Sequence, residues 1–239
     1  YAMPKVWENK LLNMMCGGDY STFVDIKGKK ARFDSQEFRD ILELCRAFYR
    51  DQLVHPSKFD SGMASSDKDM FTFMTTYINS FSELAYQMNK FSEDSVLMRM
   101  PGEYGRARVS AGTSISINSS CKSMDTCWGF IKFLANYERL GQAARVAEQS
   151  GLFTNKAIFN ARLDNATNVG TFFADRAVLD SKSIDFIVNY ISDIRSSIYP
   201  GHEIDIIVSS EIDAFFNGTA SADAVAKRIQ NRVELYLNE

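Results

Sequence analysis

The sequence predicts an α/β fold in which helices outnumber strands, and two observations lead to this prediction. In residues 109–140, apolar and small polar residues alternate up to Ile117, and apolar residues then recur at helical spacing after Ser123. This pattern indicates a half-buried strand that leads into a long, capped helix with one broad apolar face. Elsewhere helical periodicity predicts at least five helices in all, with few strand-like runs between them. We therefore expect strand and helix units docked on a sheet.

Length and composition set the limits for the fold and the partners. With 239 residues, 45% apolar and 24% charged, the chain can bury a large core in one domain or two lobes. A net charge of −3 gives no electrostatic reason to bind nucleic acid or an anionic membrane. No run approaches the ~18 apolar residues of a membrane span, and the first residues do not resemble a secretory signal. We expect either a cytosolic protein or one whose targeting segment lies outside this chain.

The first fifty residues predict two helices joined by a hairpin. A short apolar helix within residues 1–16 is expected to stop at Gly17-Gly18. Residues 23–33 resemble a small hairpin or edge strand that turns at a Lys-Gly-Lys sequence. Asp34, with Glu37 three residues later, is the expected capping box of the second helix, which continues to Tyr49.

The middle of the chain predicts two further strands and a helix. Residues 70–74 read as a buried strand, and residues 84–88 as part of a helix. Residues 96–100 are another strand candidate, ended by Pro101. The ends of such strands are where binding sites collect in α/β proteins.

The last third predicts four helices. A short helix is expected at residues 159–163, and a longer one begins at Ser183 and presents apolar residues as far as Ile198. A third spans residues 203–216, and Ser221 caps the last.

The four cysteines, Cys16, Cys45, Cys121 and Cys127, have no metal-type spacing. Because Cys45 and Cys127 fall on apolar faces of predicted helices, we expect buried thiols. A disulfide between Cys121 and Cys127 is the alternative.

Enzyme motifs are missing from the sequence. It has no GxSxG, P-loop or GxGxxG motif, and its two histidines, His55 and His202, lack metal-site spacing. We therefore expect no catalytic residue, no metal and no cofactor. A glycoside-acting enzyme would need two carboxylates facing each other across a cleft, and the sequence offers no pair to nominate.

Four stretches together resemble one protein family. Residues 7–48 contain an apolar helix, a hairpin and the segment FDSQEFRDILELCRAF, and residues 69–80 read DMFTFMTTYINS. Residues 100–142 contain a Pro-Gly loop, a strand and the helix WGFIKFL, and residues 211–239 read EIDAFFNGTASADAVAKRIQNRVELYLNE. In order and residue type they are similar to the carboxyl-terminal part of the extracellular solute-binding proteins of bacterial carbohydrate importers, the group that includes maltose-binding protein.

The resemblance implies a periplasmic-binding-protein-like fold of type II, in which two lobes close over a sugar and present it to an ABC transporter. Residues 1–92 and 150–239 would belong to the second, helix-rich lobe, and residues 93–149 would be an excursion into the first. The family also has a signal sequence and often a lipid anchor ahead of the part seen here, which implies an extracytoplasmic lipoprotein. Without its partner strands, the segment 96–117 is expected to self-associate.

The first group of candidate ligand residues is aromatic, because sugar sites stack pyranose rings on aromatic side chains and bind hydroxyl groups with planar polar ones. Tyr77, with Asn79 beside it, matches the family position of a stacking aromatic at a strand end; ordinary packing is the alternative. Trp7 matches a position at the cleft, with core packing as the alternative. Tyr104 is either a lid aromatic or an exposed loop residue.

The second group is polar. The resemblance places His202 and Asp205 in a region that adds cleft contacts, although His202 at a surface position would simply face solvent. Gly112 and Thr113 would offer backbone groups to the cleft, but a strand glycine can equally mark a close backbone crossing.

These residues lead to a binding-module hypothesis. The expected partners are a mono- or oligosaccharide and the permease subunits of an ABC importer, with no nucleic acid and with membrane attachment only through the missing anchor. The alternative is a truncated lobe that acts as a structural or protein-interaction module and does not close on a ligand.

Overall fold

A computed structural model describes residues 2–55, 71–73, 78, 80–91, 94–99, 108–109, 115–134, 152, 156–166, 179–194, 196–197 and 201–239. The chain divides into two compact units, and both are discontinuous in sequence. Unit 1 consists of Tyr1–Met74, Arg99–Ser110 and Asp193–Glu239, and unit 2 of Thr75–Met98 and Ala111–Ser192. The chain therefore passes between the units at 74/75, 98/99, 110/111 and 192/193. The assignment of residues 1–92, 93–149 and 150–239 to lobes stays a prediction.

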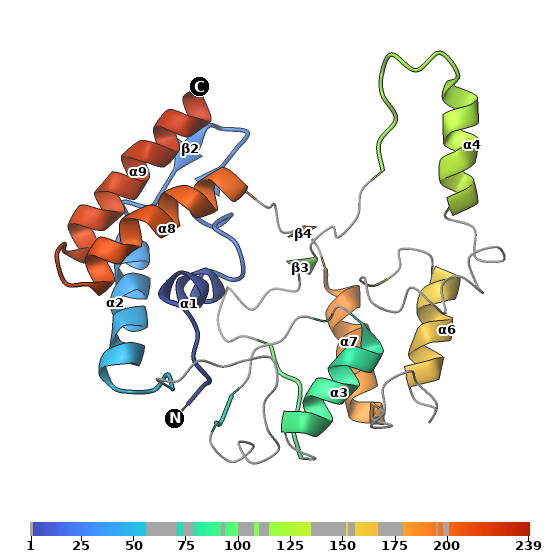
Figure 1. The fold of residues 1–239 in the computed structure, drawn as a ribbon, viewed down its shortest axis with the longest axis horizontal. Coiled ribbons are helices and arrows are strands. Elements are labelled where there is room, and N and C mark those ends of the chain that lie inside the picture. The colour runs from blue at the N-terminus through green and yellow to red at the C-terminus, as the bar shows by residue number, and fades with distance from the viewer. Residues whose placement is uncertain are drawn as a thin grey trace. The chain divides into compact units, whose positions relative to one another are not determined.

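Helix α1 (Glu8–Met15) opens unit 1, with Trp7 as its N-cap and Cys16 as its C-cap (Figure 1). Gly17 and Gly18 follow with φ of 82° and 89°, the left-handed region that favours glycine because it has no Cβ. The predicted stop at this glycine pair is confirmed.

The hairpin consists of β1 (Val24–Asp25) and β2 (Lys30–Ala31), paired antiparallel with Val24 opposite Ala31. In its turn, Gly28 donates its backbone N–H to Asp25 Oδ1 over 2.9 Å. A Cβ at Gly28 would lie only 2.3 Å from Asp25 Oδ2, so any other residue would have to displace this bond. The hairpin predicted within residues 23–33 is confirmed.

Helix α2 (Gln36–Arg50) begins one residue later than predicted. Its N-cap is Ser35, whose Oγ accepts from the backbone N–H of Phe38 over 3.2 Å. The prediction of Asp34 as the cap, with Glu37 as its capping-box partner, is wrong, because the Asp34 carboxylate pairs with Arg39. The apolar spacing of the helix was predicted correctly: Phe38, Ile41, Leu42 and Cys45 are buried.

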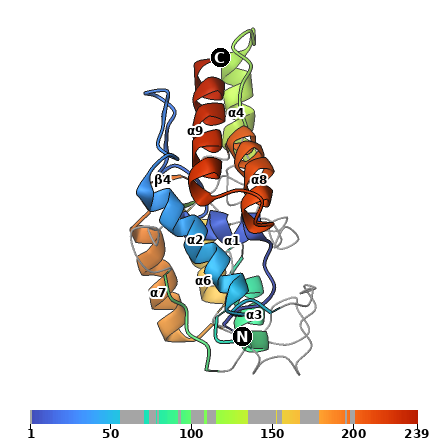
Figure 2. The same ribbon diagram turned by 90° about the vertical axis from the view of Figure 1, so that its left-hand side faces the viewer.

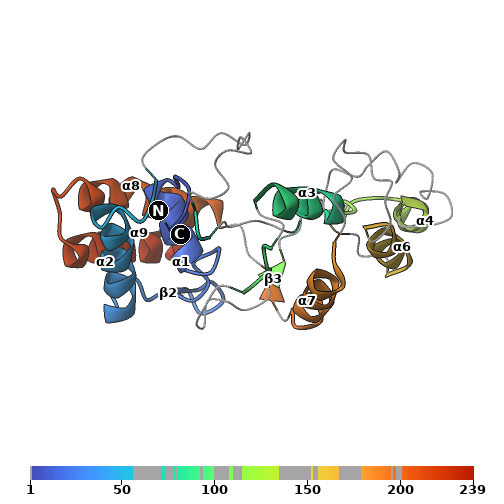
Figure 3. The same ribbon diagram turned by 90° about the horizontal axis from the view of Figure 1, so that it is seen from below.

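Helices α8 (His202–Phe216) and α9 (Ala222–Asn238) complete unit 1 and pack against each other (Figure 2, Figure 3). Asn217 ends α8, and Gly218 turns the chain with φ of 74°. Ser221 Oγ then accepts from the N–H of Ala224 over 3.2 Å. Both helices and the Ser221 cap match their predictions.

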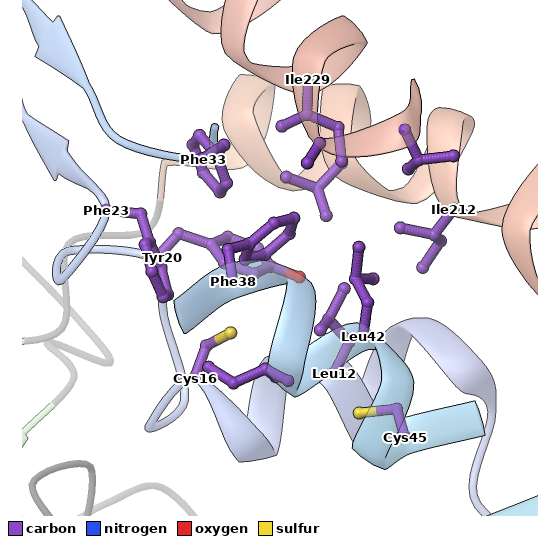
Figure 4. Close-up of a cluster of buried hydrophobic side chains, with 14 of the residues drawn as sticks. Leu12, Cys16, Tyr20, Phe23, Phe33, Phe38, Leu42, Cys45, Ile212 and Ile229 are labelled. Carbon is purple, nitrogen blue, oxygen red and sulfur yellow. The ribbon is translucent and has the colours of Figure 1, made fainter. Parts of the chain in front are cut away.

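The core of unit 1 gathers side chains from α1, α2, α8, α9 and the hairpin (Figure 4). Phe38 lies at its centre, with ring centroids 5.2 Å from Phe23 and 5.0 Å from Phe33 in edge-on geometry. Side chains with no exposed surface include Leu11, Leu12, Phe23, Phe33, Phe38, Leu42, Cys45, Val208, Ile212, Phe215, Val225, Ala226, Ile229 and Val233. The first fifty residues and the last forty therefore pack together in one core.

Unit 2 contains α3 (Phe81–Phe91), α4 (Met124–Leu134), α6 (Lys156–Ala166) and α7 (Ser181–Ser192). Helix α3 packs on α6, where the rings of Phe81 and Phe159 lie 5.3 Å apart. The described buried residues of this unit form a smaller cluster: Phe81, Leu84, Ala85, Leu179 and Ile187. The helices predicted around residues 84–88 and 159–163 are confirmed.

The start and end of α7 differ from prediction. Asp180 Oδ1 accepts from the N–H of Ser183 over 2.8 Å, so Asp180 takes the capping role. Ser183 is buried inside the helix with its hydroxyl toward Met88, which leaves it unable to cap. The helix also ends at Ser192 and not at Ile198, since Ser196–Ser197 form β4 in unit 1.

Most of the described residues that were predicted to form strands do not form one. Residues 71–73 form no strand, and Phe73 is 52% exposed although a buried strand was expected. Residues 96–99 likewise form no strand, and Val96 is 78% exposed. Of the described residues in the strand predicted over residues 109–117, Val109 pairs, because β3 (Arg108–Val109) lies parallel to β4, and residues 115–117 form no strand. Residues 110–114 lie outside the described residues. Alternation alone does not make a strand where no neighbouring chain accepts its hydrogen bonds.

Helix α4 is not docked as predicted. None of its residues with a described side chain is buried, and Trp128 is 54% exposed. Cys121 and Cys127 are free and only partly covered, so the expectation of buried thiols is wrong for these two and right for Cys16 and Cys45.

The described residues are mostly helical and include two small two-stranded sheets, consistent with an α/β or helix-rich class. Within those residues, we find no helix with the length and hydropathy needed to span a bilayer.

Candidate functional site

Three of the eight predicted ligand residues lie in the described part of the chain: Trp7, His202 and Asp205. All three belong to unit 1. The other five lie outside the described residues: Tyr77, Asn79, Tyr104, Gly112 and Thr113.

The Trp7 side chain lies at the surface, 60% exposed, so the core-packing alternative is wrong. Its backbone is held in place because its carbonyl accepts from Leu11 N over 2.8 Å, and the preceding carbonyl of Val6 accepts from Tyr49 Oη over 2.6 Å. The Nζ atom of Lys5 lies 5.0 Å from the centroid of the indole ring, a cation–π contact. The result is a solvent-facing aromatic ring beside a cation, on a backbone held by hydrogen bonds.

Asp205 lies in the first turn of α8, where its N–H donates to Gly201 O over 2.9 Å. Its side chain is half-buried, and burial raises the pKa of the carboxyl group above its ordinary value. The neighbouring Asp19 raises this pKa further, whereas His202 and Lys10 lower it. His202 itself is exposed at the first position of α8.

Two further residues at this place were missed by sequence reasoning. Asp19 is buried, and its Oδ1 accepts from Ser21 N and Ser21 Oγ over 3.1 and 2.7 Å. Tyr20 is buried as well; burial, followed by the nearby Cys16 and Asp205, raises the pKa of its phenol. The Asp-Tyr-Ser sequence after the glycine pair is an Asx-turn signal that could have drawn attention to Asp19.

We call Lys10, Asp19, Tyr20, His202 and Asp205 the Asp205 cluster. It forms where α1 packs against α8, which brings residues nearly two hundred positions apart into electrostatic contact. At the surface it offers the side chains of Lys10, His202 and Asp205, which can bind hydroxyl groups, whereas Asp19 and Tyr20 are buried.

Trp7 and one member of the Asp205 cluster, Lys10, belong to the same part of the chain, the N-cap and body of α1. Trp7 caps the start of α1, whereas Asn13, which hydrogen-bonds Tyr20, is in its last turn. At 1.5 Å of rise per residue, roughly 9 Å of helix axis separates these two positions. The aromatic ring therefore lies at the start of α1, and Tyr20 of the cluster lies near its end, with His202 and Asp205 contributed by α8.

A metal site has no support in the residues that the structure covers. Among them, no three or more His, Cys, Asp or Glu side chains come together in a way that could hold an ion. The two carboxylates of the cluster also differ in access, because Asp19 is buried and bonded to Ser21 whereas Asp205 reaches the surface.

Comparisons with known proteins do not place the chain in a family. No protein-family model matches its sequence, and a search of curated proteins gave no significant match.

Proposed function

We propose that this chain is part of the carbohydrate-binding subunit of an ABC importer, which captures a mono- or oligosaccharide reversibly between two lobes. The observation that carries the proposal is the solvent-exposed Trp7 ring with Lys5 beside it in unit 1.

The Trp7 ring supports a sugar as the ligand. A solvent-exposed indole can stack on the apolar face of a pyranose, which contributes about 1 kcal/mol beyond the area it buries. In this arrangement Lys5, next to the ring, donates hydrogen bonds to sugar hydroxyl groups.

The Asp205 cluster supplies the polar side of the proposed site. A half-buried carboxylate accepts hydrogen bonds from hydroxyl groups more strongly than one in bulk water, because the local dielectric constant is lower. Tyr77, Asn79, Tyr104, Gly112 and Thr113 stay proposed contacts on the strength of the family resemblance. The same resemblance supports the importer permease as partner, an extracytoplasmic location and non-covalent binding without catalysis.

Titration calorimetry with a panel of mono- and oligosaccharides tests the proposal, with the thermal unfolding midpoint as a second measurement. We expect one sugar class to bind and to raise Tm, and Trp7→Ala to weaken that binding roughly fivefold, the equivalent of about 1 kcal/mol. Trp128→Ala is the matched control, since it removes a similarly exposed indole from unit 2, 54% exposed against 60% for Trp7. Absence of heat and of any Tm shift across the panel would overturn the proposal.

A second candidate function is the interaction module, and α4 is the observation that favours it. Its exposed side chains include Met124, Trp128, Phe130 and Phe133. Exposed aromatic residues so close together are typical of protein-binding surfaces. Light scattering over a concentration series tests this alternative: association that disappears in Trp128→Ala would support it, and a monomer at every concentration would exclude self-association.

A further inference from the structure

Two thiols meet where the chain enters α4. Cys121 closes a turn in which its N–H donates to Asn118 O over 2.9 Å, and Cys127 lies in the first turn of α4, with its N–H bonded to Ser123 O over 3.1 Å. These backbone bonds place the two Sγ atoms 3.0 Å apart.

The surroundings of this pair differ from those of the other two cysteines. Cys16 and Cys45 are fully buried in the unit 1 core, whereas Cys121 and Cys127 are both partly exposed. A disulfide reagent in solution can therefore reach the second pair and not the first. Accessibility and proximity together are what a redox-reactive dithiol requires.

We infer that Cys121 and Cys127 are a reactive dithiol that closes into an intramolecular disulfide by exchange with a small-molecule disulfide such as oxidised glutathione. The bond requires the sulfur atoms to approach by about 1 Å, from 3.0 Å to the ~2.05 Å of a disulfide. A side-chain rotation on this exposed turn provides that movement, because no buried contact of α4 has to be broken.

The exchange takes place in two steps. The Cys121 thiolate attacks one sulfur of oxidised glutathione, forms a mixed disulfide and releases one glutathione thiolate. Cys127 then loses its proton to solvent, and its thiolate attacks the Cys121 sulfur and displaces the second glutathione thiolate. The protein loses two thiol hydrogens, and one molecule of oxidised glutathione becomes two molecules of reduced glutathione.

The hydrogen bonding assigns the order of attack. A hydrogen bond from Cys127, together with one from the Ser123 backbone N–H, lowers the pKa of Cys121. The same contact raises the pKa of Cys127. Cys121 is therefore the attacking thiol and Cys127 the resolving one. This site is independent of the proposed sugar site, whose described residues lie in unit 1.

The reduced full-length chain, incubated folded with oxidised glutathione, tests the inference by intact mass and peptide mapping without reductant. We expect loss of two hydrogens with no glutathione retained. Because Lys122 lies between the two cysteines, trypsin should release peptides 109–122 and 123–132 joined by a disulfide.

The single variants Cys121→Ser and Cys127→Ser are matched controls. Cys127→Ser should retain one glutathione at Cys121, and this adduct should persist roughly tenfold longer than in the unmodified chain, because the intramolecular resolving thiol is gone. Cys121→Ser should react more slowly than Cys127→Ser.

Two results would overturn the inference. One is stable attachment of two glutathione molecules to the folded chain without joined peptides. The other is reaction of Cys16 and Cys45 as fast as that of Cys121, which would show that exposure does not select the pair.

Discussion

Helices α2 and α4 make an instructive comparison between the two units. Both carry apolar residues at helical spacing, but α2 buries Phe38, Ile41 and Leu42 in a core shared with α1 and α9. No described side chain of α4 is buried, and its aromatic residues face solvent. The same sequence pattern thus produces a core helix only where a second apolar face packs on it.

The comparison extends to the two units. Unit 1 has one core that joins elements from both ends of the chain, whereas the described core of unit 2 is confined to α3, α6, α7 and the residues beside them. Local stability follows buried apolar contact. We therefore expect unit 1 to be the more stable unit, and the following changes test that difference in order of expected effect.

Phe38→Ala should have the largest effect. The change removes a fully buried ring that contacts Phe23 and Phe33, and should lower the free energy of unfolding by about 3–5 kcal/mol. Urea denaturation followed by far-UV circular dichroism measures the loss. The matched control is Phe130→Ala on α4, which should stay within about 0.5 kcal/mol of the unmodified chain. Equal losses in the two variants would refute the contrast between the helices.

Glu211→Gln should have the next largest effect, because Glu211 on α8 bonds Arg228 and Arg232 of α9 at 2.6 and 2.7 Å. The arginine side chains are partly solvated, so we expect a loss of about 1 kcal/mol. Although burial alone would raise the pKa of Glu211, these two arginines lower it below its ordinary 4.5. A carboxyl group with a depressed folded pKa stabilises the protein above pH 4.5 and loses that contribution as the pH falls through the folded value.

Unfolding midpoints measured from neutral pH down to below pH 4.5 check this assignment. The difference in unfolding midpoint between the unmodified chain and Glu211→Gln should become smaller as the Glu211 carboxyl group is protonated. A difference that stays constant with pH would assign the loss to packing and not to charge.

Ser221→Ala should cost about 1 kcal/mol, because the N-cap of α9 loses its side-chain acceptor. Asp180→Ala removes the equivalent acceptor from α7 in unit 2. Hydrogen exchange measured by mass spectrometry should show faster exchange in the first turn of the affected helix in each case. If Asp180→Ala instead accelerated exchange throughout unit 1, the two units would not be independent.

Asp205→Asn should have the smallest effect, and it should stabilise the protein where the other substitutions destabilise it. Since burial raises the folded pKa of Asp205 above 3.8, its charged form is disfavoured in the folded state. The neutral amide should raise Tm at pH 7 by roughly 1 °C, and the gain should vanish as the pH falls below the raised pKa. Scanning calorimetry at pH 7 and at a pH below the raised pKa measures this change in Tm. A lower Tm at pH 7 would show that the carboxylate is a net stabilising group.

Local signals in the sequence were enough to predict most helices. Gly17-Gly18 and Ser221 mark boundaries through backbone conformation and side-chain bonding that involve only neighbouring residues. Predictions failed where two nearby residues could each cap a helix: Ser35 is the cap of α2 in place of Asp34, and Asp180 takes the capping role of α7 in place of Ser183. The residue that does not cap has another contact: Asp34 pairs with Arg39, and the Ser183 hydroxyl faces Met88.

Strands and the site were harder to predict, because both depend on partners distant in sequence. Val109 pairs in a strand only through Ser197, and Asp205 joins Asp19 only because α8 packs on α1. Trp7 stays a predicted ligand residue, and its exposure follows from its position before the first turn of α1, where the core does not reach.

The position of α9 in the core has a consequence for biosynthesis. Val225, Ile229 and Val233 fill the same interior as Leu12, and Gln230 bonds the backbone of Ala31 and Asp34 in the hairpin region. A ribosome must therefore release residues 222–238 before the first fifty residues can bury their phenylalanine side chains. Until then the nascent chain exposes that apolar surface, to which chaperones can bind.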